Sequence, residues 1–192
     1  QRQMIFFEGF ENELVNWSLD GGWGLTGDAV NGEFALSDSP EGEYQEGQES
    51  IAELDRFIDL NYLNSPVVEF KAKWEIESNW DFVRFQANIQ DLGWVSLNGS
   101  YTELGSGQPA QPFGEPGYDG VQNEWVNEII FLDQLNGADI LGFRFIQTSD
   151  NFVEGDGFTF DDLSISGFPT GTMGDYNLDT LVDVYDLSLI HI

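Results

Sequence analysis

The stretch Val68-Glu-Phe-Lys-Ala-Lys-Trp-Glu-Ile-Glu77 decides the fold, because apolar and charged residues alternate along its whole length. Successive side chains of a β-strand point to opposite faces, so this pattern predicts a strand with one buried and one wet face. Residues 81–89 and 141–145 alternate in the same way. Half-buried strands of this kind are typical of antiparallel sheets, which can leave one face in water.

Shorter strands are predicted between acidic loops rich in Gly and Pro, and no segment has a convincing helical period. Roughly ten strands without helices predict an all-β fold, an antiparallel β-sandwich; the resemblance described below implies that it is a jelly roll. Long loops are expected at 38–50 and 103–120, and the second is long enough to be functional. The shorter strands are expected at residues 5–8, 23–26, 33–37, 56–60, 94–97, 124–132 and 157–165.

The charge balance excludes two classes of partner. Six Lys and Arg stand against 35 Asp and Glu, which gives a formal net charge of -29. Nucleic acid and anionic membrane surfaces repel such a chain, whereas divalent cations are attracted. No apolar run approaches the ~20 residues of a membrane span. Because the chain has no cysteine, we expect a secreted protein that is stabilised by bound calcium in place of disulfides.

A calcium loop is predicted at residues 175–186. Oxygen-bearing side chains stand at loop positions 1, 3, 5, 9 and 12, the spacing by which a twelve-residue loop wraps one Ca²⁺ ion. The carbonyl of Leu181 at position 7 would complete the set of ligands. A solvated acidic turn is the alternative. The predicted side-chain ligands are Asp175, Asn177, Asp179, Asp183 and Asp186.

With Gly174 in front and Val182 at position 8, this EF-hand-like loop resembles the first half of a dockerin type I repeat. The resemblance implies a truncated dockerin, because the second repeat is missing. Residues 167–174 are interpreted as a linker. The last six residues, 187–192, match the translation of CTGTCTCTTATACACATC, which resembles a transposon end used in sequencing libraries. We interpret them as an adaptor-encoded tail; the alternative is a natural helix start.

Residues 1–166 resemble the MAM-like jelly-roll domains. Phe7-Glu-Gly-Phe-Glu11, the following Asn16-Trp17 and the closing segment 156–165 carry this resemblance. Secreted bacterial zinc carboxypeptidases have a similar domain after their catalytic unit, and immune-inhibitor-A-type metallopeptidases carry a related module. The segments that resemble the carboxypeptidase domain are 74–81, 114–122 and 144–150.

The resemblance implies a non-catalytic, calcium-stabilised accessory module that positions or targets a peptidase domain in cis. In similar folds, carboxylates near the chain termini meet at a structural calcium, which removes the cost of bringing like charges together. Applied to this chain, the resemblance implies a second calcium site. Its ligands would be Glu11, Asp38, Asp161 and Asp162; the alternative is a set of solvated edge carboxylates.

No catalytic site is expected in the chain itself. A zinc peptidase needs two His and a Glu on the metal, and nucleophilic catalysis needs a base such as His beside Ser or Cys. The only histidine is His191. A carbohydrate-binding module and an adhesin-type module for an extracellular or cell-surface protein stay open as alternatives. The aromatic residues that would form a sugar-stacking platform are Trp80, Trp94, Trp125 and Tyr118.

Four of the six cations stand at outward positions of the predicted strands: Lys71, Lys73, Arg84 and Arg144. We expect cross-strand ion pairs with acidic residues on the wet face. The predicted acidic partners are Glu69, Glu75 and Glu77. A basic patch that docks a catalytic domain or an acidic ligand is the alternative.

Overall fold

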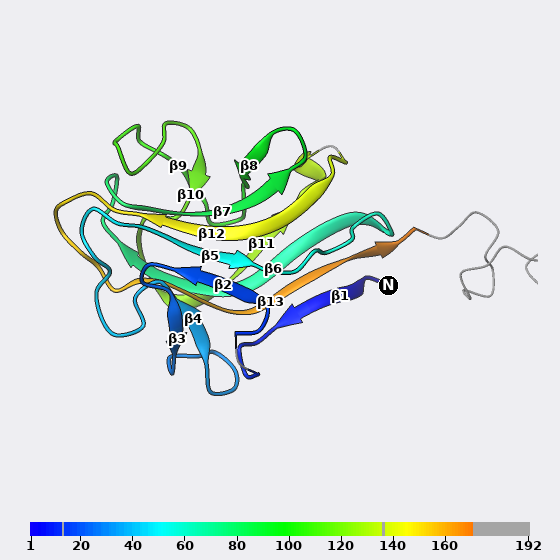
Figure 1. Cartoon of the computed structure of the whole chain (residues 1–192), viewed down its shortest axis with the longest axis horizontal. Helices are drawn as coiled ribbons and strands as arrows, with labels where there is room; N and C mark the ends of the chain where they lie inside the picture. The colour runs from blue at the N-terminus through cyan, green and yellow to red at the C-terminus, as the bar shows by residue number, and fades with distance from the viewer. Residues whose placement is uncertain (13, 136, 171–192) are drawn as a thin grey trace, which may run out of the picture.

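The computed structural model describes residues 1–12, 14–135 and 137–170. The predicted calcium loop at 175–186, most of the linker and the tail at 187–192 therefore lie outside the described residues. Within them, two antiparallel sheets pack face to face (Figure 1). The helical element of this part of the chain is a short 3-10 helix, η1 (Leu132–Leu135).

The first sheet has the strand order β11-β6-β13-β4-β3, and β1 also pairs with β13. The second sheet has the order β2-β5-β12-β7-β8. The first sheet contains β1 (Gln3–Glu8), β3 (Gly24–Thr26), β4 (Ala35–Ser37), β6 (Leu63–Ile76), β11 (Gly120–Phe131) and β13 (Gly157–Pro169). The second contains β2 (Trp17–Asp20), β5 (Glu49–Leu54), β7 (Phe82–Ile89), β8 (Gly93–Ser96) and β12 (Ile140–Thr148), and a separate ladder joins β9 (Glu103–Leu104) to β10 (Pro116–Gly117).

The chain crosses repeatedly from one sheet to the other, as from β4 to β5 and from β11 through β12 to β13. This alternation is typical of a jelly roll. The predicted all-β jelly-roll sandwich is therefore confirmed.

Aromatic side chains from both sheets fill the interior. Phe145 of β12 stacks on Phe160 of β13 with ring centroids 4.1 Å apart. Phe70 of β6 meets Phe145 edge-on at 5.4 Å, and Phe85 of β7 lies 4.8 Å from Phe145. All four are at most 1% exposed. Alternation along each strand places these rings inward, as the sequence predicts.

A β-bulge divides β13 into two parts. Asp162 has a φ of 52°, and the register shifts between Asp161 and Ser164. Before the bulge, Phe160 pairs with Leu36 of β4; after it, β13 pairs with β1. The same edge of β13 therefore pairs with β4 before the bulge and with β1 after it, because a bulge bends the strand that carries it.

Two strand predictions need correction. Residues 56–60, predicted as a strand, do not form one. The strand in this region is β5 (Glu49–Leu54), which begins at the end of the predicted loop 38–50. In β5 the side chains of Ser50, Ala52 and Leu54 point inward and that of Ile51 points outward. A polar residue therefore faces the core and a large apolar residue faces out, which is the reverse of the pattern used for the prediction. The prediction also missed β2.

Substitution of Phe160 by Ala should lower the free energy of unfolding by about 3–5 kcal/mol, because it removes a ring held by both sheets and leaves a cavity. Urea unfolding followed by tryptophan fluorescence measures this. Phe113→Ala is the matched control, because Phe113 is 86% exposed, and it should change stability by less than about 0.5 kcal/mol. Equal losses for the two variants would contradict this account of the core.

Candidate ligand-binding face of the second sheet

A row of polar side chains crosses the outer face of the second sheet. Its members are cross-strand partners in succession on β2, β5, β12, β7 and β8. Because strands are spaced by ~4.8 Å, four steps give a row about 19 Å long, perpendicular to the strands. We call it the polar row; it consists of Ser18, Glu53, Arg144, Gln86 and Ser96.

Hydrogen bonds hold three of the five members of the polar row in one arrangement. Arg144 Nε donates to Gln86 Oε1 at 2.8 Å, and Gln86 Nε2 donates to Ser96 Oγ at 3.1 Å. Ser96 Oγ in turn donates to Glu115 Oε2 at 2.7 Å. The same oxygen accepts a bond of 3.0 Å from the Arg84 guanidinium, which forms an ion pair. A network that fixes its own side chains is preorganised to bind.

Trp94 adds a flat apolar surface beside the polar row. The guanidinium of Arg144 lies 4.3 Å from the centroid of its ring. The indole lies over Gly142 of β12, where an added Cβ would stand at an ordinary contact distance of 3.9 Å from Trp94 Cη2. Trp94 and Arg144 are both half-buried, so the stacked pair keeps an open side. Stacking of this kind combines electrostatic attraction with the broad surface of the indole.

Arg144 has N–H groups that donate no hydrogen bond within the described part of the chain. Its Nε–H bonds Gln86, and within the described part of the chain its terminal nitrogens donate no hydrogen bond. Burial lowers the pKa of Arg144, and the charge of Arg84 lowers it further. A guanidinium nevertheless stays charged at any working pH, so these N–H groups remain donors for oxygen atoms of a ligand.

The four predicted platform residues do not lie together. Trp94 is on the outer face of the second sheet, whereas Tyr118 is fully buried in the core. Trp125 of β11 packs against Lys73 on the first sheet, and Trp80 is 41% exposed at the end of the sandwich beyond β12. The interpretation of these residues as one platform is therefore wrong.

The predicted ladder of ion pairs is also wrong. Lys71 and Lys73 belong to the first sheet, and the residues opposite Lys73 and Lys71 on β13 are Thr159 and Asp161. Lys73 instead pairs with Asp28 in a loop. Arg84 pairs with Glu115, which comes from the segment after β9. The sequence pattern gives the outward direction of these cations correctly but cannot give their neighbours.

Three of the four carboxylates predicted to meet at a calcium surround one loop. Asp161 Oδ2 accepts the N–H groups of Val30 and Asn31 at 3.0 and 3.2 Å. Glu11 Oε1 accepts those of Glu33 and Phe34 at 2.8 and 2.9 Å, and the Asn31 amide donates to Asp162. Burial raises the pKa of Asp161. Here the carboxylates tie the 30–34 loop to β1 and β13.

Asp38 does not belong to this group. It lies just after β4, and its backbone N–H donates to the carbonyl of Phe158, three residues before Asp161 on β13. Because strand residues rise by ~3.3 Å each, the two carboxyl groups are separated along the sheet. The prediction of Asp38 as a ligand shared with Glu11, Asp161 and Asp162 is corrected accordingly.

A different group of acids could hold a metal. The carboxylate oxygens of Glu77, Asp81 and Asp150 lie within 4.8 Å of one another. The Tyr44 hydroxyl donates to Asp81 at 2.7 Å, and the Asp150 N–H donates to it at 2.6 Å. Burial and then the charge of Asp150 raise the pKa of Glu77. Sequence spacing did not reveal this group, because Asp150 follows β12 and stands 69 residues after Asp81, although β12 and β7 are paired in the sheet.

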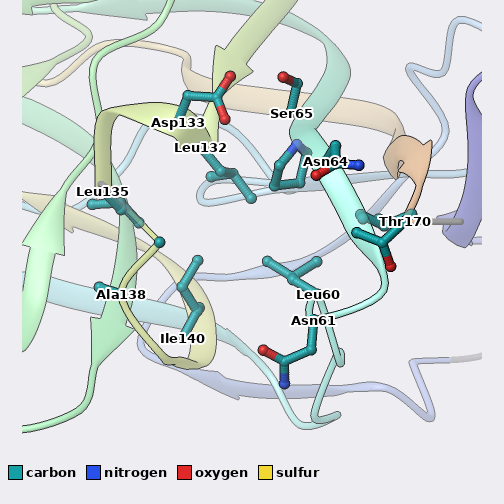
Figure 2. A pocket seen from close by; sticks show the side chains of 13 residues that line it. Leu60, Asn61, Asn64, Ser65, Leu132, Asp133, Leu135, Ala138, Ile140 and Thr170 are labelled. Carbon is teal, nitrogen blue, oxygen red and sulfur yellow. The ribbon is translucent and has the colours of Figure 1, made fainter. Parts of the chain in front are cut away.

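Two hollows lie at opposite ends of β12, with Arg144 between them. One is a cavity of about 330 Å³, where apolar Leu60, Leu132 and Ile140 face polar Asn64 and Thr170 (Figure 2). The other is a groove of about 430 Å³ beyond the end of β12, which Trp80 and Phe152 help to line. No member of the polar row lines either hollow.

No protein-family model matches the sequence, and no curated protein matches it. Several solved structures are similar to this chain at TM-scores below 0.5. The family 22 xylan-binding domain of Paenibacillus barcinonensis Xyn10C is 13% identical, with 85% of this chain and 93% of that chain covered and a TM-score of 0.48. The K2 cleaved adhesin domain of Lys-gingipain is 12% identical over 83% and 96%, with a TM-score of 0.49.

A family 30 carbohydrate-binding module of a Clostridium thermocellum cellulosomal cellulase is 15% identical over 87% of this chain and 98% of that one, with a TM-score of 0.46. At these scores the similarity does not identify a ligand. The resemblances to MAM-like domains and to a dockerin remain predictions from the sequence. No helix among the described residues is long and apolar enough to cross a membrane.

Substitution of Glu115 by Ala should lower the free energy of unfolding by about 1–2 kcal/mol, because it leaves the buried Arg84 guanidinium without its anionic partner. Urea unfolding provides the measurement. Glu103→Ala serves as the control, since this exposed residue lies in β9 outside the network. A Glu115 variant as stable as the control would show that the network contributes nothing to folding.

Proposed function

We propose that this domain is a non-catalytic module that binds an extended, hydroxyl-rich carbohydrate chain along the polar row. The observation that carries the proposal is the registered polar row on five adjacent strands, with Trp94 stacked beside it. Ser18, Glu53, Arg144 and Ser96 are accessible to a ligand, whereas Gln86 is buried and holds Arg144 and Ser96 in place. Each sugar hydroxyl both donates and accepts hydrogen bonds, as this mixture of groups requires. The indole face of Trp94 suits the apolar face of a pyranose ring.

The chemistry of the face favours a neutral chain. Glu53 and Glu115 accompany Arg144 and Arg84, so the face has no excess of positive charge. The protein as a whole carries a net charge of -29, which repels polyanions. A protein partner would instead favour an apolar centre with few charges. A neutral polysaccharide therefore fits this face better than an acidic polymer or a protein surface does.

A binding module of this kind would target a linked catalytic domain to a polysaccharide outside the cell. The assignment of that catalytic domain to the zinc peptidases rests on the sequence resemblance alone. Carbohydrate binding, which the sequence left as an alternative, is better supported by the geometry than the accessory role in a peptidase.

Calorimetry against soluble xylan, mannan, mixed-linkage β-glucan and xyloglucan tests the proposal. At least one should bind, and Trp94→Ala and Arg144→Ala should each weaken that binding at least tenfold, or about 1.4 kcal/mol. Trp80→Ala is the matched control, because it removes an exposed indole at the end of the sandwich. Failure of all four to bind at millimolar concentration, or equal effects of the Trp94 and Trp80 variants, would refute the proposal.

We also propose that calcium stabilises the chain, with one ion in the 175–186 loop at a Kd of about 10⁻⁴ M, as in extracellular modules. The spacing of its oxygen ligands supports this. Calorimetry of the full chain with calcium chloride should show one ion fewer after the double substitution Asp175→Ala and Asp179→Ala. An unchanged stoichiometry would remove the loop from the calcium sites.

A further inference from the structure

A small cavity beside the end of β4 contains a buried carboxylate with an unpaired oxygen. The cavity has a volume of about 190 Å³ and is formed mainly by residues 38–48. Asp38 lines it and is 1% exposed. The N–H of Phe158 and the hydroxyl of Ser39 both donate to Asp38 Oδ1, each at 2.9 Å. Oδ2 is buried and has no hydrogen-bond partner among the described residues.

No positive charge among residues 1–12, 14–135 and 137–170 forms an ion pair with Asp38. The two ion pairs in the described part of the chain are Lys73 with Asp28 and Arg84 with Glu115. The charge that acts on Asp38 comes from Asp156 and is also negative, and burial raises the pKa of Asp38 to about 7. A buried carboxylate without a partner is costly, so it takes either a proton or a cation. Above neutral pH the carboxyl group loses its proton, and a bound cation would then compensate its charge.

The other groups around the cavity are suitable ligands for a hard cation. The segment supplies oxygens and no sulfur or imidazole: Ser39, Glu41, Glu43, Gln45 and Gln48 all line it beside Asp38. Calcium takes six to eight such oxygens in flexible arrangements that often include carbonyl groups and water. The segment also lies against the turn that leads into β13, because Tyr44 N donates to the carbonyl of Gly155 at 3.1 Å.

We propose that this cavity binds one calcium ion, with Asp38 Oδ2 as a ligand. The site is separate from the 175–186 loop and from the group of Glu11, Asp161 and Asp162. It is also separate from the acids around Asp81, since the Tyr44 side chain lines the cavity while its hydroxyl bonds Asp81. The ion would fasten the 38–48 segment to the body of the sandwich. The proposal does not rest on carbohydrate binding.

The test uses the full chain with Asp175→Ala and Asp179→Ala, which removes the loop site, at pH 8. Adding Asp38→Asn keeps the acceptor for Phe158 N–H and removes the charge of the unpaired oxygen. Calcium at about 100 times Kd should raise the melting temperature of the parent by about 5–10 °C. The Asp38 variant should lose at least half of that increase and bind one calcium ion fewer, without melting lower than the parent in chelator.

Asp91→Asn is the matched control, because it removes one exposed carboxylate at a residue with a φ of 66°, which Asn tolerates; it should keep the full calcium response. An Asp38 variant with the stoichiometry and calcium response of the parent would overturn the proposal. If the variant does not fold, anomalous scattering from crystals of the parent grown in calcium chloride decides. A calcium peak beside Asp38 supports the site, and its absence there overturns it.

Discussion

The packing of Phe145 against Phe160, with ring centroids 4.1 Å apart, is the contact on which the rest of the structure depends. It joins β12 of one sheet to β13 of the other, and both strands are central in their sheets. Because side chains alternate along a strand, fixing these two rings inward fixes Arg144 and Asp161 outward. The same aromatic core therefore sets the direction of the polar row and of Asp161, which binds the 30–34 loop.

The binding face follows from register as well as direction. Five strands contribute one residue each to the polar row, and every neighbour is set by a backbone ladder. A shift of one residue in any pair would turn a polar member inward and a core residue outward. Hydrogen bonds through Gln86 and Ser96 to Glu115 then limit the side-chain freedom that a ligand would otherwise have to remove on binding.

The sequence predicts the class of fold well, because strict alternation in 68–77 and 81–89 is a strong local signal. It fails where small or polar residues face the core, as Ser50 and Ala52 do in β5. It gives the outward direction of Lys73 and Arg84 but not their ion-pair partners, Asp28 and Glu115, which lie outside the long strands. Tertiary structure alone brings Glu77 close to Asp150 and leaves Asp38 Oδ2 buried without a hydrogen-bond partner among the described residues. Neither feature produces a pattern along the sequence.

The division of β13 by the bulge at Asp162 has a consequence for how the chain folds. β1, at the amino end, pairs with Leu163–Gly167, about as far along the described chain as a partner can be. Loop closure over such a distance is slow, so the first strand stays without its ladder until nearly the whole domain has been synthesised. During that interval its exposed Met4 and Phe7 belong to an unpaired strand, and chaperone binding or aggregation would begin there.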